Sequence, residues 1–67
     1  MNIIINGNVK VFNVANLTMA DLVAELDLVG KRLAIEKNGE IVPRGQFADV
    51  LLQEGDKLEI VGAVGGG

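Results

Sequence analysis

The stretch TMADLVAEL, residues 18–26, has the spacing of one short helix. Its apolar side chains recur at intervals of three and four, so they share one helix face: Met19, Leu22, Val23 and Leu26. The Thr18 hydroxyl can accept hydrogen bonds from the first-turn amides, and the Asp21 carboxylate complements the positive end of the helix. We therefore predict a helix that begins after Thr18 and packs its apolar face against a sheet.

Before this helix, the sequence predicts a hairpin around Asn6-Gly7-Asn8. A two-residue loop at Asn6-Gly7 would place Ile3 opposite Lys10 and would mix apolar and polar side chains on both faces. A three-residue loop gives matched faces, because Ile5 then lies opposite Val9. We adopt the three-residue loop, which defines two sets of side chains: Ile3, Ile5, Val9 and Val11 face the core, whereas Ile4, Lys10 and Phe12 face outward.

After the helix, the sequence predicts three more strands. Residues 33–37 alternate like a strand, Asn38-Gly39 is a turn signal, and the short strand at 40–42 ends at Pro43. The turn at 54–56 precedes a last strand at 57–61, which returns beside the first. This order indicates an α+β fold of the β-grasp (ubiquitin-like) class, a mixed sheet of four to five strands wrapped over one helix. We assign residues 1–63 to this domain and residues 64–67 to a flexible C-terminal tail.

The composition argues against several classes of function. The net charge is −3 and the basic residues are scattered, whereas nucleic-acid binding requires clustered Lys or Arg. The chain has no Cys, His or Tyr, and its internal glycines stand singly, so we expect no cofactor, no metal site and no ATP site. The apolar runs are too short to span a membrane, and no signal peptide is visible. We expect a cytoplasmic protein that is monomeric when free.

The chain ends in Val64-Gly65-Gly66-Gly67. Glycine lacks a Cβ atom, so such a tail can pass through a narrow channel as an extended ribbon. The five residues 63–67 could carry the terminal carboxylate about 16 to 18 Å from the domain. Because the composition offers no reactive side chain of this kind, the remaining reactive group is the Gly67 carboxylate. At neutral pH this carboxylate is an anion, so it must be activated before a nucleophile attacks it.

Several segments together resemble the ThiS family, the sulfur carriers of thiamine biosynthesis. They are AIEKNGEIVPR at 34–44 followed by Phe47, EGDKLEIV at 54–61, and the terminal glycines 65–67. The resemblance covers nearly the whole chain. It implies a carrier rather than an enzyme: Gly67 is adenylated by a ubiquitin-activating-type enzyme (ThiF-like), is converted to a thiocarboxylate, and passes its sulfur to a thiazole synthase (ThiG-like).

Two alternatives share the fold. The small subunit of molybdopterin synthase uses the same thiocarboxylate chemistry, and a non-covalent β-grasp interaction module would have an inert tail. For a carrier, we expect partners to dock on the outward face of the sheet near the tail. The candidate docking residues are Ile4, Phe12, Val61 and Val64, and we expect Ile4 and Val61 to lie close together because the first and last strands are neighbours.

Overall fold

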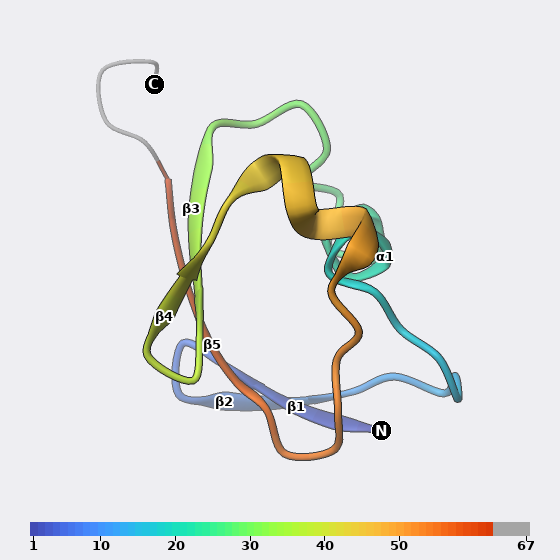
Figure 1. Ribbon diagram of the computed structural model, residues 1–67. Coiled ribbons are helices and arrows are strands. Elements are labelled where there is room, and N and C mark those ends of the chain that lie inside the picture. Colours follow the sequence, from blue (N-terminus) through green and yellow to red (C-terminus); the bar gives the residue numbers. More distant parts are fainter. Residues whose placement is uncertain (63–67) are drawn as a thin grey trace.

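The computed structural model describes residues 1–62. Along the chain it contains β1 (Asn2–Ile5), β2 (Asn8–Val11), α1 (Met19–Glu25), β3 (Leu33–Lys37), β4 (Glu40–Val42), the 3-10 helix η1 (Arg44–Asp49) and β5 (Lys57–Gly62). The five strands form one sheet in the order β2-β1-β5-β3-β4, in which β1 runs parallel to β5 and the other pairs are antiparallel (Figure 1). The predicted mixed sheet over one helix is confirmed.

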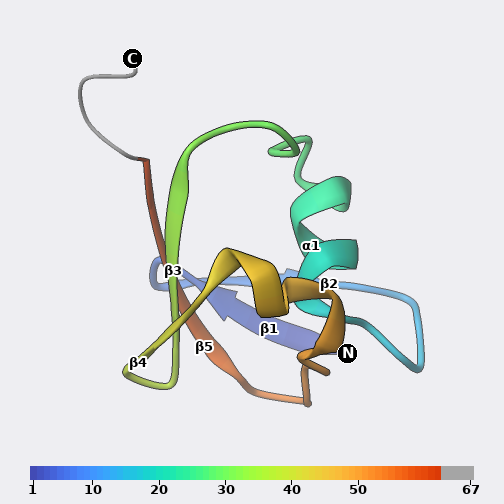
Figure 2. The same ribbon diagram turned by 45° about the horizontal axis from the view of Figure 1, so that its top comes forward.

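Helix α1 begins as its sequence predicts. The Thr18 hydroxyl accepts from the Asp21 amide at 3.0 Å, and the Asp21 carboxylate accepts from the Thr18 amide at 3.1 Å, so both partners of a capping box are present. The helix and η1 lie on the same side of the sheet (Figure 2). Between them and the sheet lies the core: Ile3, Phe12, Leu17, Met19, Leu22, Val23, Ile35, Leu52 and Leu58.

The register of the first hairpin differs from our prediction. Ile4 pairs with Val9 and Ile3 pairs with Lys10, so the loop contains two residues, Asn6 and Gly7. Both have positive φ, 49° and 85°, and this backbone conformation matches the twist of a two-residue hairpin. The turn therefore decides the register, although the faces of the hairpin are mixed.

This change of register turns every side chain of β2 to the opposite face. Val9 and Val11, predicted to face the core, are 65% and 60% exposed, whereas Phe12, predicted to face outward, is only 6% exposed. Lys10 lies on the inner face, yet its side chain is exposed because β2 is an edge strand. The edge position explains how the sheet tolerates a charge on that face.

Candidate functional site

Strand β5 ends at Gly62, the last residue that the structure describes. The predicted site residues Val64, Gly65, Gly66 and Gly67 lie outside the described residues, as does the boundary that we placed between residues 63 and 64. Their roles remain predictions. The structure describes the strand that carries the tail and the sheet face beside it.

Strand β5 is the central strand of the sheet, but its two sides are held unequally. On one side it pairs with β3 from Leu58 to Gly62. On the other side, within residues 1–62, it pairs with β1 only at Lys57 and Leu58, because β1 turns away at Asn6. The last part of β5, next to the tail, therefore has its strand partner on one side.

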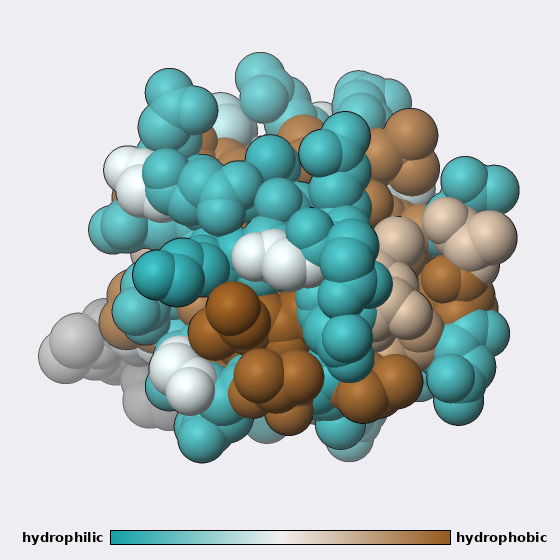
Figure 3. Space-filling view, turned by 90° about the horizontal axis from the view of Figure 1, so that it is seen from below, coloured by the Kyte–Doolittle hydropathy of each residue, from teal (hydrophilic) through white to brown (hydrophobic). Residues whose placement is uncertain are grey.

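The outward face of the sheet carries two groups of apolar side chains. Cross-strand partners share a face, so Ile4, Val9 and Val11 lie together on β1 and β2, and we call them the hairpin patch. Ala34, Ile41 and Val61 lie on β3, β4 and β5, and we call them the β5 patch. Figure 3 shows brown, hydrophobic atoms gathered among hydrophilic ones on the underside of the molecule.

The predicted docking residues do not all lie together on the outward face of the sheet. Val61 faces outward and is 60% exposed, as predicted. Phe12 lies in the core, so its predicted place in a docking face is wrong. Ile4 pairs with Lys57, four residues before Val61, which corresponds to about 13 Å along a strand, so the predicted close approach of Ile4 and Val61 is also wrong.

Val9 and Val11 were predicted to face the core and were therefore not among the expected docking residues. The two-residue turn Asn6-Gly7 is the signal that could have found them, because it fixes which side chains of β2 face outward. The charged side chains of Lys57 and Glu59 lie on the outward face of β5 between the two patches. The face is thus apolar at both ends and charged in the middle.

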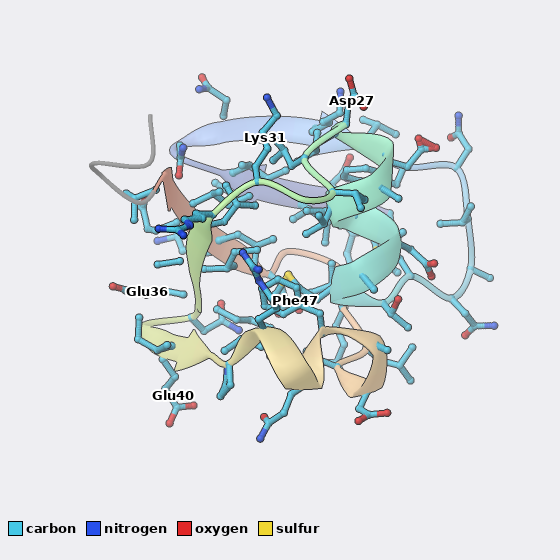
Figure 4. All side chains as sticks on the ribbon, turned by 90° about the horizontal axis from the view of Figure 1, so that it is seen from above. Asp27, Lys31, Glu36, Glu40 and Phe47 are labelled. Atoms are coloured by element: carbon cyan, nitrogen blue, oxygen red, sulfur yellow. The ribbon has the colours of Figure 1, made fainter. Side chains whose placement is uncertain are left out.

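A hollow of about 210 Å³ opens on the other side of the sheet, between α1, the loop that follows it and η1. Figure 4 looks into this region and shows Phe47 reaching from η1 toward it, with Lys31 on the loop above. The Arg44 guanidinium donates to the Lys31 carbonyl oxygen at 2.8 Å across its rim. Its lining holds no carboxylate, hydroxyl, imidazole or thiol, and its charged side chains are those of Lys31 and Arg44.

The turn before β5 is held to the sheet by a carboxylate. Glu54 accepts a hydrogen bond from the Asn2 amide at 2.9 Å, and this bond lowers the pKa of the Glu54 carboxyl from its ordinary value. Among residues 1–62, no group of three or more His, Cys, Asp or Glu could hold a metal ion. The same residues include no helix that is long and apolar enough to cross a membrane.

Comparisons with known proteins agree with this architecture. The chain matches the model of the ThiS family over residues 3–67. The sulfur carrier protein ThiS of Bacillus subtilis is 40% identical over 50 residues, which cover 75% of this chain and 76% of that protein. A crystal structure of the thiamine biosynthesis protein ThiS from Geobacter metallireducens has a TM-score of 0.85 and 29% identity, with full coverage of both chains.

The chain spans about a fifth or less of the length of two similar proteins, both named thiazole synthase. A thiazole synthase from Paramagnetospirillum magneticum is 43% identical over 67 residues, which are 100% of this chain but only 20% of that protein. A segment similar to the whole chain is therefore part of that synthase polypeptide.

Proposed function

The chain belongs to the ThiS family of sulfur carriers in thiamine biosynthesis, and from this premise we propose that Gly67 carries the sulfur as a C-terminal thiocarboxylate. The match to the family over residues 3–67, which includes the terminal glycines, carries this proposal. The chain is then a co-substrate rather than a catalyst.

The chemistry has two steps. A carboxylate oxygen of Gly67 attacks the α-phosphorus of ATP, pyrophosphate leaves, and an acyl-adenylate remains. A sulfur nucleophile at the oxidation level of sulfide then attacks the acyl carbon, so that a C–S bond forms as the C–O bond to AMP breaks. The carrier supplies the carboxyl group and its reach, and the ATP site belongs to an activating enzyme of the ubiquitin-activating (ThiF-like) type.

We propose a ThiG-like thiazole synthase as the acceptor of the sulfur. The long relative from Paramagnetospirillum magneticum supports this partner, because it bears the name thiazole synthase and contains a segment similar to the entire chain. Two activities that share a polypeptide act at high effective concentration. In this chain, the same association would occur through docking.

Docking uses the outward sheet face. The hairpin patch and Val61 expose apolar side chains on the face beside β5, and an exposed apolar group of this kind is typical of a partner site. We propose Val64, which lies outside the described residues, as a further docking residue. The exposed Lys57 and Glu59 can pair with charges on the partner. Phe12 takes no part, because it is buried.

Intact-mass analysis tests the proposal. The carrier is incubated with ATP, the activating enzyme and a sulfur source, and the expected product has one oxygen replaced by sulfur at Gly67. A chain that lacks Gly67 is the control, since its terminus falls short by about 3.5 Å. An unchanged mass, while the same enzyme modifies a known carrier, would refute the thiocarboxylate. Sulfur transfer as a subunit of molybdopterin synthase, instead of to thiazole synthase, would favour the alternative pathway.

A further inference from the structure

Both Asn-Gly turns of the chain bond to β5 through the side chain of their asparagine. Asn6 and Asn38 each open a turn with positive φ, 49° and 52°, and each is followed by a glycine with positive φ. The first turn joins β1 to β2 and the second joins β3 to β4. Since β1 and β3 flank β5, the two turns reach the strand from opposite sides.

Asn6 continues the pairing of β1 with β5 beyond the point where β1 ends. Its carboxamide oxygen accepts from the Ile60 amide at 2.7 Å, and its carboxamide nitrogen donates to the Ile60 carbonyl oxygen at 3.0 Å. Its backbone amide donates to the Leu58 carbonyl oxygen at 2.9 Å. The side chain thus supplies to Ile60 the donor and acceptor that a further residue of β1 would have supplied.

Asn38 makes the corresponding bonds at the other end of β5. Its carboxamide oxygen accepts from the Lys57 amide at 3.0 Å, and its carboxamide nitrogen donates to the Asp56 carboxylate at 3.0 Å. Its backbone amide donates to the Lys57 carbonyl oxygen at 2.8 Å. The two asparagines therefore differ in position and in one partner. Asn38 holds the start of β5 and the Asp56 carboxylate, whereas Asn6 holds the backbone of β5 near the end of the strand.

We infer that Asn6 is a positioning residue for the terminal carboxylate, an inference that rests on the proposed function. Asn6 belongs to the hairpin that carries the hairpin patch, and Ile60 lies two residues before the end of β5. The two carboxamide bonds therefore fix the start of the tail relative to a docking surface on the hairpin. Gly67 lies five residues past Gly62, at most about 16 to 18 Å away, so the position and direction of the strand end set the region that the carboxylate can reach. A strand end that is fixed relative to the docking surface keeps the reacting geometry within that region.

The test compares Asn6→Gly with Asn38→Gly. Glycine keeps the positive φ of each turn and removes only the carboxamide, so each variant loses two carboxamide bonds, at opposite ends of one strand. For Asn6→Gly, we expect kcat of adenylation to fall about tenfold or more, with KM for the carrier changed less than about twofold because the hairpin patch is intact. For Asn38→Gly, we expect both constants to change less than about twofold.

Amide hydrogen exchange gives a readout that needs no enzyme. Exchange at Ile60 should accelerate in Asn6→Gly, and exchange at Lys57 should accelerate in Asn38→Gly. If Asn6→Gly is unfolded at the assay temperature, Asn6→Asp replaces it, because this side chain keeps the acceptor for the Ile60 amide and loses the donor.

Three results would overturn the inference. An equal loss of kcat in both variants would mean that Asn6 acts only through stability. A normal kcat despite accelerated exchange at Ile60 would mean that the bonds form but position nothing. A wild-type chain that is never adenylated would refute the proposed function and the positioning role with it. If exchange at Ile60 still accelerates in Asn6→Gly, the Asn6 bonds exist and the failure belongs to the proposed function.

Discussion

Changing Val61 to Asp should separate docking from folding. Val61 is 60% exposed on the outward face of β5, so only about 40% of its surface is buried in the free protein. Full burial of a valine side chain contributes about 1.5–3 kcal/mol, so loss of this part should cost about 1 kcal/mol of folding free energy. For a domain of this size, that corresponds to a fall in Tm of about 4 to 8 °C. An unpaired charge buried in the complex should cost about 2 kcal/mol or more, or roughly 30-fold in Kd for the activating enzyme.

Val29→Asp is the matched control. Val29 is 71% exposed but lies in the loop after α1, away from the outward sheet face, so the same substitution there should leave Kd unchanged. Thermal unfolding and titration calorimetry measure the two quantities. A fall in Tm as large as that of a core variant would refute the outward orientation of Val61, and an unchanged Kd would show that the enzyme docks elsewhere.

Three further predictions follow from the core, the tail and the turn before β5. Phe12→Ala should lower the free energy of unfolding by about 3 to 5 kcal/mol in denaturant titrations, since Phe12 is 6% exposed; a loss below about 1 kcal/mol would contradict its burial. Gly66→Val should leave the Tm unchanged and sharply slow adenylation, because a branched side chain narrows the backbone conformations and widens the tail; a normal rate would disprove passage through a narrow channel. The hydrogen bond from the Asn2 amide lowers the pKa of the Glu54 carboxyl from its ordinary value of 4.5. The ionised carboxylate therefore stabilises the fold at pH values above 4.5, and this stabilisation is lost as the pH falls through the pKa of the folded protein. Glu54→Gln should therefore lower the Tm at neutral pH, and this difference in Tm should shrink progressively as the pH falls below 4.5. A difference that stays constant with pH would reject this contribution.

The elements of the fold could be predicted because each has its own local signal. Thr18 and Asp21 mark the start of α1, and Asn38-Gly39 marks the second hairpin; both are found where the sequence places them. The register of the first hairpin could not be derived from the matching of faces. Two conflicting signals met there, and the turn conformation at Asn6-Gly7 outweighed the preference for unmixed faces.

The candidate site shows the same limit. Val61 was placed correctly because the alternation of β5 is regular around the buried Leu58. Phe12 was placed on the wrong face, and Val9 and Val11 were missed, since all three depend on the register of β2. The carboxamide bonds of Asn6 to Ile60 join residues 54 positions apart, and a pattern of neighbouring residues does not reveal such a contact.

The charge on the inner face of β2 bears on how the carrier behaves at high concentration. An edge strand offers unpaired backbone groups to other chains, and proteins commonly block this association with inward-pointing charges or with short edge strands. The lysine in the middle of β2 provides the first device at one edge of the sheet. At the other edge, β4 has only three residues and is followed at once by Pro43. Both edges therefore disfavour aggregation by strand addition, so the apolar face beside β5 can remain open to partners without the sheet joining copies of itself.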